Sequence, residues 1–363
     1  MQQLIWYWRG TTHLEDRITI NGRTIGTGYP TYVVAELSAS HHQDLERAAQ
    51  LVRAAKEAGA NAVKVQAYTP DTLTMDSSTR WFRIGKGTPW EGRSLYELYR
   101  GTYMPWEWIP KLKALARDLG IDLFSTAYDL SSVDFLEETG MPAYKLASYE
   151  LVDLALVERM ARTGKPLIMS TGMASLGEIE EAVQTARHAG ATQIALLKCT
   201  SAYPASPDEM NLRTIPHLAE TFHVPVGISD HSLTMCVPMA AVTLGACIVE
   251  KHFTLSRSVR GPDTAYSLEP EEFKTMVESI RTIEAAVGQV QYGITAHEAQ
   301  SIVFRRSLFV TRDLKRGETF SEHNVRSIRP GYGLSPKYLK LVLGRKAARA
   351  LARGTPLTWE LIK

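Results

Sequence analysis

Two stretches decide the fold of this chain: Val226-Gly227-Ile228-Ser229-Asp230-His231 and Ala246-Cys247-Ile248-Val249-Glu250-Lys251-His252. Each is a short apolar run that ends in ionisable residues, one of them a histidine. Short apolar runs are typical of strands that are buried on both faces of a parallel sheet. Six more runs of this kind precede them, at residues 32–37, 62–67, 121–126, 143–148, 167–171 and 194–199.

Eight such strands are the number in a parallel (β/α)8 barrel, the TIM barrel, which takes roughly 250 residues. Helical patterns lie between the runs. Residues 44–58 carry an apolar stripe that stops before Gly59, and residues 175–189 repeat this design before Gly190. A last helix over residues 271–287 closes the predicted barrel. The predicted fold class is therefore α/β.

Both ends of the chain lie outside the predicted barrel. We expect an N-terminal extension and hairpin over residues 1–30, the barrel over 31–288, a linker over 289–304 and a small β-rich domain over 305–363. Asn21-Gly22 supplies the two positive φ angles of a tight hairpin turn, and this hairpin is predicted to cap the bottom of the barrel. About 60 residues is small for a free-standing core, so we expect the last domain to dock on another surface.

The interval between the second strand and its helix, residues 68–105, is unusually long for a connection in a barrel. Two interpretations remain open: the interval is a lid over the active rim, or its aromatic rings pack on the barrel wall. The rings in question are those of Trp81, Phe82, Trp90, Tyr96 and Tyr99.

Composition narrows the class of protein. The 363 residues include 41 Lys and Arg and 39 Asp and Glu, and a net charge of +2 does not favour nucleic acid or an anionic membrane as a partner. The three cysteines form no CxxC pair, which fits a reducing compartment, so we expect a cytoplasmic protein. Residues 1–10 lack the apolar core of a secretory signal, and no stretch approaches the roughly 20 apolar residues of a membrane span.

The carboxyl ends of all eight strands of a (β/α)8 barrel meet at one rim, which carries the active site in such enzymes. Residues that are far apart in the sequence become neighbours there. The predicted rim collects Glu36, Lys64, Gln66, Thr126, Lys145, Ser148, Glu150, Ser170, Thr171, Lys198, Thr200, Ser229, His231, Lys251 and His252. A single shared pocket explains this set better than separate structural roles do.

Two histidines, His231 and His252, follow the last apolar residues of adjacent predicted strands. Two neutral imidazoles suit a divalent cation that polarises a substrate oxygen. The alternative is that each histidine only forms local hydrogen bonds, and the residues alone leave both interpretations open.

Two lysines, Lys64 and Lys145, lie within apolar runs, where an unpaired charge is costly. Together with nearby hydroxyl groups they favour a site for a phosphate or a carboxylate. They could instead be solvated strand ends, or one of them could form a Schiff base, because desolvation lowers the pKa of a lysine. The hydroxyl groups are those of Thr126, Ser148, Ser170 and Ser229.

Two carboxylates complete the predicted pocket. Glu36 ends the first strand and Glu150 follows the fourth, so one could transfer a proton and the other could accept a hydrogen bond from a substrate hydroxyl. Either carboxylate could instead pair with Lys64 or Lys145.

These strand ends match a known pattern. The matching segments are Ala35-Glu36-Leu37, Val63-Lys64-Val65-Gln66, Tyr144-Lys145-Leu146-Ala147-Ser148, Ser170-Thr171-Gly172-Met173, Lys198-Cys199-Thr200, Tyr203-Pro204, Ser229-Asp230-His231-Ser232, Glu250-Lys251-His252-Phe253 and Gly261-Pro262-Asp263. In this order they resemble the sialic acid synthase family of phosphoenolpyruvate-condensing enzymes over nearly the whole chain. The tail resembles the antifreeze-like (SAF) domain of that family, through Ser307-Leu308, Lys315-Arg316-Gly317-Glu318 and Arg329-Pro330-Gly331.

The resemblance implies two substrates, a metal and a dimer. The metal, Mn²⁺ or Mg²⁺ with Co²⁺ as an alternative, would be held by His231 and His252. Phosphoenolpyruvate would be held by Lys64, Thr126, Lys145, Ser148, Ser170 and Ser229. The acetamido sugar would contact Gln66, Glu150, Tyr203, Asp263 and Arg329 of the partner subunit, whose C-terminal domain would be swapped over this barrel. We assign catalysis to Glu36, Lys64 and Lys145, with Glu36 orienting or deprotonating a water molecule.

Several segments also resemble the branch of the family that uses a 2,4-diacetamido-2,4,6-trideoxy hexose. By this resemblance, Ser201 stands at the position where family members that use N-acetylmannosamine have an Asn. N-acetylmannosamine or a related amino sugar remains the alternative substrate. Two segments depart from the family pattern: Ser40-His41-His42-Gln43 replaces Asn-His-x-Gly, and Ala127-Tyr128 replaces Pro-Phe. A Schiff-base aldolase and a non-catalytic carbohydrate-binding protein are the alternative functions.

Overall fold

The computed structural model describes residues 17–88 and 90–363, so most of the predicted N-terminal extension lies outside the described residues. Parallel strands close into a barrel in the order β10-β3-β4-β5-β6-β7-β8-β9, which confirms the predicted TIM barrel. The strands are β3 Tyr32–Glu36, β4 Ala62–Ala67, β5 Asp122–Ala127, β6 Tyr144–Leu146, β7 Leu167–Ser170, β8 Ile194–Cys199, β9 Val226–Asp230 and β10 Ile248–His252.

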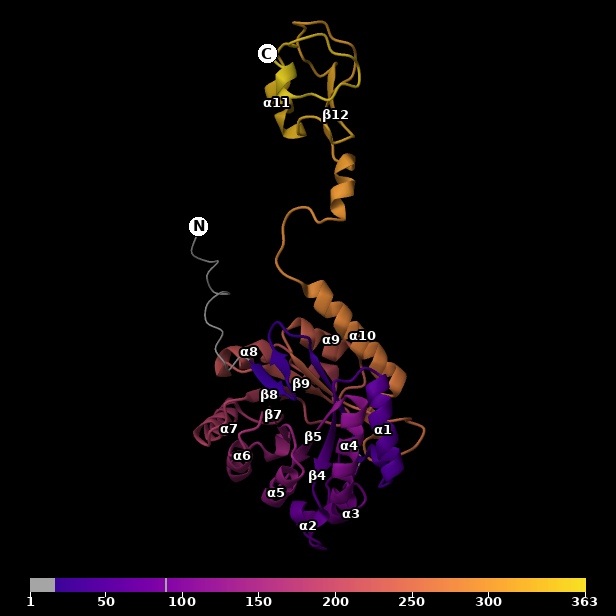
Figure 1. Ribbon diagram of the computed structural model, residues 1–363, viewed down its shortest axis with the longest axis vertical. Helices are drawn as coiled ribbons and strands as arrows, with labels where there is room; N and C mark the ends of the chain where they lie inside the picture. The colour runs from indigo at the N-terminus through magenta and orange to yellow at the C-terminus, as the bar shows by residue number, and fades with distance from the viewer. Residues whose placement is uncertain (1–16, 89) are drawn as a thin grey trace. The chain divides into compact units, whose positions relative to one another are not determined.

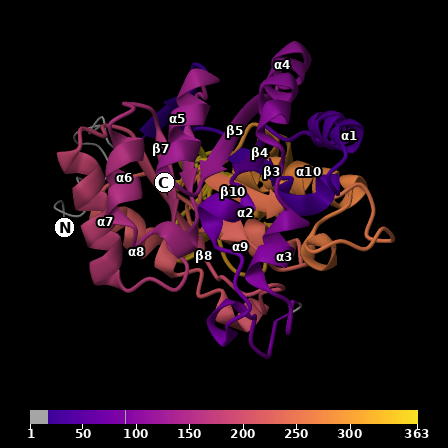
Figure 2. The same ribbon diagram turned by 90° about the horizontal axis from the view of Figure 1, so that it is seen from below.

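Helices surround this barrel, as the end-on view shows (Figure 2). They are α1 Leu45–Glu57, α4 Ile109–Leu119, α5 Leu130–Glu138, α6 Leu154–Ala161, α7 Leu176–His188, α8 Thr214–Phe222, α9 Cys236–Thr243 and α10 Pro270–Val287. The three helices predicted from apolar stripes, α1, α7 and α10, are present with nearly the predicted bounds.

Side-chain caps explain why these helix starts were predictable. The carboxylate of Asp44 accepts a hydrogen bond from the backbone N–H of Arg47 at 3.1 Å at the start of α1. At the start of α7, Ser175 and Glu178 exchange side-chain and backbone hydrogen bonds. Such residues satisfy N–H groups that have no partner within the helix.

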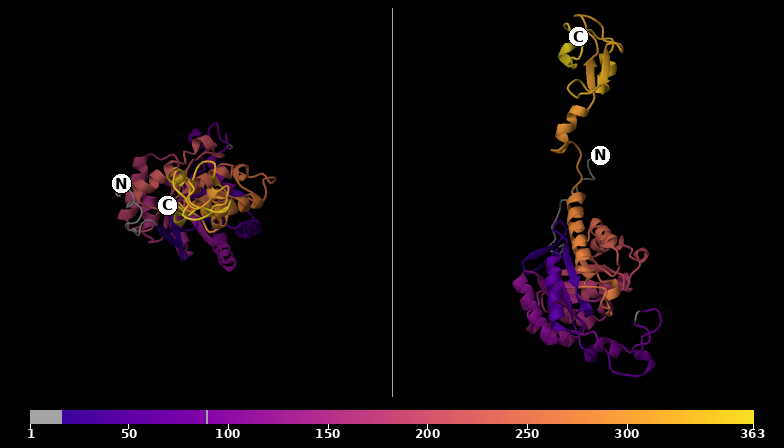
Figure 3. Two further views of the ribbon diagram at one scale, coloured as in Figure 1. Left: turned by 90° about the horizontal axis from the view of Figure 1, so that it is seen from above. Right: turned by 90° about the vertical axis from the view of Figure 1, so that its right-hand side faces the viewer.

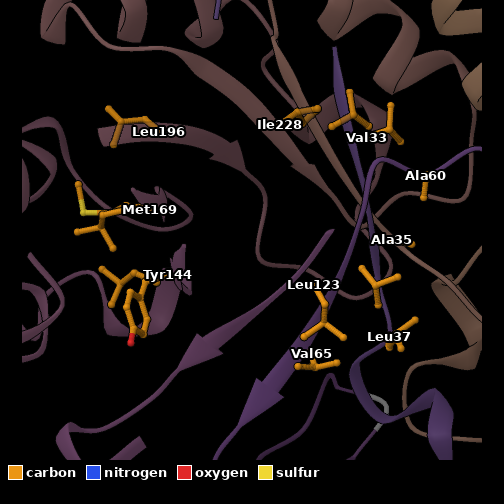
Figure 4. Close-up of a cluster of buried hydrophobic side chains, with 14 of the residues drawn as sticks. Val33, Ala35, Leu37, Ala60, Val65, Leu123, Tyr144, Met169, Leu196 and Ile228 are labelled. Atoms are coloured by element: carbon orange, nitrogen blue, oxygen red, sulfur yellow. The ribbon is translucent and has the colours of Figure 1, made fainter. Parts of the chain in front are cut away.

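Alternate residues of each strand face opposite sides of the barrel wall. The outward set packs against the helices, and Figure 4 shows part of it, including Val33, Ala35 and Leu123. The inward set forms a second core, to which Tyr32 and Val34 belong. Polar residues replace apolar ones toward the carboxyl ends of the strands. The barrel interior is therefore apolar near the amino ends of the strands and polar near their carboxyl ends.

The predicted hairpin is present, with β1 (Arg17–Ile20) and β2 (Arg23–Gly26) in an antiparallel pair. Asn21 and Gly22 both have positive φ angles, 47° and 79°, as the predicted turn requires. Its isoleucines belong to the inner core of the barrel. The hairpin lies at the opposite end of the barrel from α2 (Pro70–Leu73) and α3 (Leu95–Arg100), at the upper side of the barrel in Figure 1, and it closes the end where the barrel strands begin.

The long interval after β4 places some of its aromatic rings in the lining of the central pocket and leaves others exposed. Tyr99 packs edge-on against Tyr68, with ring centroids 5.8 Å apart, and both rings line the central pocket. Trp90 also lines that pocket, whereas Trp81 is 73% exposed. The interval projects from the end of the barrel that carries the strand carboxyl ends (Figure 3, right).

The chain divides into two compact units, and the second begins at Gln289. The second unit contains a 3-10 helix, Glu298–Phe304, an antiparallel pair of strands, β11 (Ser307–Val310) and β12 (Val325–Ile328), and the short helix α11 (Leu339–Val342). Residues including Leu308, Phe320 and Leu357 form its own core. Within residues 17–88 and 90–363, no helix is long and apolar enough to span a bilayer.

Candidate active site

One cavity of about 410 Å³ opens at the carboxyl ends of the barrel strands. It brings together most of the residues that we predicted for the site. These are Glu36, Lys64, Gln66, Lys145, Ser148, Glu150, Ser170, Tyr203, Ser229, His231, His252 and Asp263. Thr126 does not line the cavity but accepts a hydrogen bond from Lys64 at 3.0 Å. Arg329 belongs to the second unit.

The ammonium of Lys64 lies between two carboxylates. Its Nζ is 2.8 Å from Glu36 Oε2 and 3.4 Å from Glu250 Oε1, and all three side chains are almost completely buried. Burial opposes the charged form of Lys64, but Glu250 and Glu36 outweigh burial and raise the pKa of its ammonium. The pairing of Glu36 with Lys64, an alternative in the sequence interpretation, is therefore what the structure contains.

Lys145 lies in a different environment. Its Nζ donates a hydrogen bond to the carbonyl of Leu146 at 2.6 Å, and no carboxylate of the described residues forms an ion pair with it. Burial lowers the pKa of this ammonium to about 8. Lys145 is thus a buried cation that lacks a counter-ion, in a cavity that is open to ligands.

Hydroxyl groups lie beside this cation. Ser148 Oγ accepts a hydrogen bond from the N–H of Gly172 at 3.1 Å, and Ser170 Oγ is buried without a partner. A Cβ atom on Gly172 would lie 2.2 Å from Ser201 Oγ, so only glycine allows the loop after β7 to approach so closely. Lys145, Ser148 and Ser170 together form a cradle that suits an anion.

The two histidines form a pair in the same cavity. The rings of His231 and His252 are 5.3 Å apart between centroids. His231 Nδ1 is 2.9 Å from the carbonyl of Thr200, and a carbonyl can only accept, so Nδ1 carries a proton. Burial opposes the charged form of His231, but Cys199 outweighs burial and raises the pKa of this imidazole. Burial, together with His231, lowers the pKa of His252 well below its usual value, so His252 is neutral. Its Nδ1 is buried without a hydrogen-bond partner.

This donor set fits a divalent metal. A metal-binding imidazole is neutral and is oriented by a hydrogen bond from its other nitrogen, as His231 is. Among the residues that the structure describes, no group of three or more His, Cys, Asp or Glu side chains could hold a metal. The protein would therefore supply two nitrogen ligands, and oxygen atoms of substrate or water would fill the remaining positions.

Aromatic rings and one carboxylate border the histidine pair. The Tyr203 ring lies 4.3 Å from that of His231, and the Tyr266 ring lies 4.9 Å from that of His252. Asp263 accepts hydrogen bonds from Ser38 Oγ at 2.5 Å and from the hydroxyl of Tyr266. Asp263 thereby connects the loop after β3 with the loop after β10.

Not every polar residue of the predicted rim faces the cavity. Lys251 points outward, where its Nζ lies 2.5 Å from Asp230 Oδ2 and also donates to the carbonyl of Ser232. Both side chains of this ion pair are fully buried. Since Lys251 and Asp230 adjoin His252 and His231, the pair ties together the two strand ends that carry the histidines. Thr171, Lys198 and Thr200 also make local hydrogen bonds instead of lining the cavity.

Several residues of the cavity were missing from the predicted site, among them Glu250, Cys199 and Tyr266. Glu250 was predictable, because it lies two residues before His252 on the same strand and must face the same side. Cys199 was predictable in the same way, because it lies two residues after Leu197, an inward residue of β8. Tyr266 ends a short 3-10 helix, Thr264–Tyr266, and no periodic pattern indicated its position.

Comparison with known proteins identifies the family. A model described as the NeuB family matches residues 51–292, and a SAF domain model matches residues 305–363. The chain belongs to the NeuB family. The resemblance predicted from the strand ends is therefore confirmed, and so is the C-terminal SAF domain.

Three relatives place the chain within the NeuB family. It is 42% identical to the pseudaminic acid synthase of Helicobacter pylori, over 92% of this chain and 98% of that protein. It is 37% identical to an N,N'-diacetyllegionaminic acid synthase of Legionella pneumophila, over 95% and 98% of the two chains. The solved N-acetylneuraminic acid synthetase of Leptospira borgpetersenii, in complex with citrate, has a TM-score of 0.71 and 30% identity, and covers 80% of this chain and 97% of its own.

The two departures from the family pattern lie near the cavity. In Ser40-His41-His42-Gln43, His42 and Gln43 have left-handed φ angles of 50° and 55°. His41 is buried against Trp108, and burial lowers the pKa of its imidazole to about 4. Tyr128 lines the cavity with its ring 5.2 Å from that of Tyr68. Tyr128 therefore changes the wall of the cavity directly, whereas His41 acts as part of the core.

Proposed function

We propose that this protein is a pseudaminic acid synthase. It would condense phosphoenolpyruvate with 2,4-diacetamido-2,4,6-trideoxy-L-altrose and give the nonulosonic acid and phosphate. One observation carries the proposal: a single cavity holds both a buried lysine without a counter-ion and a pair of buried imidazoles. Such a cavity suits an anionic substrate beside a substrate whose oxygen needs polarisation. The identity to curated synthases supports the choice of sugar.

The lysine side of the cavity would hold phosphoenolpyruvate. Lys145 would supply the charge, and Ser148, Ser170 and Ser229 would donate hydrogen bonds to oxygens of the phosphate and carboxylate. Ser229 Oγ now donates to Glu250 Oε1 at 3.0 Å, so it would turn to its ligand from an internal partner. Ser170 Oγ is free to do so at once.

The histidine side would hold the metal and the aldehyde end of the open-chain sugar. His231 and His252 would bind Mn²⁺, Mg²⁺ or Co²⁺, a cation that would polarise the aldehyde oxygen. Gln66, Glu150, Tyr203 and Asp263 would contact the sugar. Burial raises the pKa of Glu150 to about 7, and Glu150 Oε2 is buried without a partner, so this carboxyl can donate to or accept from a sugar group.

Bond formation and cleavage follow from this placement. C3 of phosphoenolpyruvate attacks the sugar aldehyde carbon, and the cationic C2 that results is attacked by water. The C2–O bond to the phosphate then breaks, phosphate leaves with the electron pair, and the oxygen added from water forms the C2 carbonyl as it loses its remaining proton. The aldehyde oxygen takes up a proton and becomes a hydroxyl. Lys145 and Lys64 stabilise the negative charge that grows on the phosphate. Burial raises the pKa of Glu36, which lies 2.8 Å from Lys64, and we assign to Glu36 the role of receiving the proton of the water.

The distribution of charge supports the proposed dimer. Residues 305–363 contain 14 Lys and Arg but 4 Asp and Glu, a net charge of +10, whereas the rest of the chain has a net charge of −8. A basic SAF domain would be attracted to the acidic barrel of a second subunit, where Arg329 of the partner subunit would complete the sugar site. Sedimentation velocity at low and high salt tests this: salt that screens the attraction should weaken the dimer. The cytoplasm, which provides phosphoenolpyruvate, is the proposed location.

A comparison of substrates tests the proposed activity. The wild-type protein is incubated with phosphoenolpyruvate, Mn²⁺ and either the diacetamido sugar or N-acetylmannosamine, and phosphate release is measured. We expect rapid release with the diacetamido sugar. Faster release with N-acetylmannosamine would favour an N-acetylneuraminate synthase, and release with neither sugar despite sugar binding would indicate a carbohydrate-binding protein.

The lowered pKa of Lys145 favours one second candidate, a Schiff-base aldolase. Borohydride would then trap a substrate-bound lysine, and EDTA would leave activity unchanged. Under the proposed function no lysine is trapped and EDTA abolishes activity.

A further inference from the structure

One wall of the cavity is built largely by the long interval after β4. This wall segment, residues 69–88 and 90–105, contributes mostly apolar and aromatic side chains together with two threonines. They are Leu73, Ile84, Thr88, Trp90, Leu95, Leu98, Tyr99 and Thr102. Two polar atoms that are buried without a partner belong to cavity residues near this wall: Trp90 Nε1 and Glu150 Oε2.

Trp90 is held by a short hairpin within the wall segment. Arg83 and Ser94 form an antiparallel bridge. The N–H of Ile84 donates a hydrogen bond to the carbonyl of Arg93 at 2.9 Å, and the carbonyl of Ile84 accepts one from the N–H of Gly92 at 2.9 Å. The φ angle of Gly92 is +80°, which allows the tight turn. The backbone thus positions the indole, and the N–H of the indole is not used for that purpose.

Trp90 lies at the sugar end of the cavity. Its ring centroid is 6.0 Å from that of Tyr203, which in turn packs 4.3 Å from the ring of His231. The phosphate cradle at Lys145 is built from other strands and contains no residue of the wall segment. A ligand group that reaches Trp90 therefore belongs to the substrate bound on the histidine side.

We propose that Trp90 is a specificity-determining residue that donates its indole N–H to the carbonyl of an acetamido group, while Leu73, Ile84 and Leu95 receive methyl groups of the sugar. This inference rests on the proposed function. An acetamido group has an acceptor and a methyl group side by side, which matches the unpartnered indole N–H of Trp90 and the apolar side chains of the wall segment. A 6-deoxy sugar adds a further methyl group, whereas a 6-hydroxyl would lose its water on such a wall.

The substitution Trp90→Phe removes the donor and keeps an aromatic ring. We expect kcat/KM for the diacetamido sugar to fall by about tenfold, because a buried carbonyl loses its hydrogen bond. The KM for phosphoenolpyruvate should not change, since Trp90 is not one of the residues that form the cradle. Trp81→Phe is the matched control, because Trp81 belongs to the same segment but is exposed and does not line the cavity; it should retain wild-type constants.

A wild-type kcat/KM for the sugar in Trp90→Phe would overturn the inference, as would an equal loss for both substrates. A second variant, Ile84→Thr, exchanges an ethyl group for a hydroxyl in the wall. Its ratio of kcat/KM for the diacetamido sugar to that for N-acetylmannosamine should fall by about fourfold, the effect expected for one buried methyl group, and an unchanged ratio would count against the wall. If the wild-type protein releases no phosphate with either sugar, the proposed function fails instead.

Discussion

Replacement of Lys145 by methionine should stabilise the ligand-free protein and at the same time remove its affinity for phosphoenolpyruvate. Burial lowers the pKa of this ammonium from 10.5 to about 8, and each pKa unit corresponds to about 1.4 kcal/mol. At pH 7 the charged side chain therefore destabilises the folded state by on the order of 3 kcal/mol. Methionine also loses the hydrogen bond to the carbonyl of Leu146, about 1–2 kcal/mol. We expect a net gain of about 1–2 kcal/mol.

The pH dependence has a defined sign. Between pH 8 and 10.5 the unfolded chain keeps the proton of Lys145 while the folded chain has lost it. The unfolded state then binds more protons, so this lysine makes the wild-type protein more stable as the pH rises through that window. Lys145→Met should lack this gain of about 3 kcal/mol, so its advantage of about 1–2 kcal/mol should disappear at about pH 9, and the wild-type protein should be the more stable one by pH 10.5.

Urea denaturation without ligand, together with steady-state kinetics, measures both effects. The loss of a buried charge contact with phosphate should raise the KM for phosphoenolpyruvate by at least about 30-fold. Lys64→Met is the contrasting variant, since it leaves the buried carboxylates of Glu36 and Glu250 without their cation and should cost about 3–5 kcal/mol of stability. The reasoning is refuted if Lys145→Met is destabilised as much as Lys64→Met, or if its KM for phosphoenolpyruvate stays at the wild-type value.

Three further perturbations follow from the site. His231→Ala should bind Mn²⁺ at least about tenfold more weakly by isothermal titration calorimetry, because one of two imidazole ligands is lost, and unchanged metal affinity would remove the metal from this position. Burial raises the pKa of Glu150 to about 7, so between pH 4.5 and about 7 the unfolded chain has lost this proton while the folded chain keeps it, and the free energy of unfolding falls as the pH rises. Glu150→Gln should lack this fall. A pH dependence identical to that of the wild-type protein would show that Glu150 is not buried as described. Lys251→Met should destabilise the protein by about 3–5 kcal/mol and Asp230→Leu combined with Lys251→Met should recover most of it, whereas equal loss in both would exclude the buried ion pair.

Much of the barrel was predictable because its strands and helices have strong periodic patterns. Short apolar runs such as residues 226–230 became β9, and Asn21-Gly22 formed the predicted turn. Helix starts were predictable where a side chain such as Asp44 caps the helix. The segment predicted as a linker contains a 3-10 helix over residues 298–304, which no strong pattern in the sequence predicted.

The composition of the site was more predictable than its pairing. The strand ends indicated that Lys64 and Glu36 share a pocket, but their contact depends on the register of β3 against β4, in which Glu36 lies opposite Lys64. Lys251 was predicted for the rim but faces outward, because it alternates on β10 with Glu250 and His252, which face the cavity. Residues on irregular loops, such as Tyr266, have no periodic pattern and could not be placed.

The central claim is that the cavity condenses phosphoenolpyruvate with the diacetamido sugar by cleavage of the C–O bond, with water adding at C2. Phosphoenolpyruvate that carries ¹⁸O in the bridging position tests it most directly. We predict that the phosphate released in the presence of sugar and Mn²⁺ contains all of the ¹⁸O, because the bridging oxygen leaves with phosphorus. Retention of ¹⁸O in the organic product would mean that the P–O bond breaks, and it would contradict the proposed reaction.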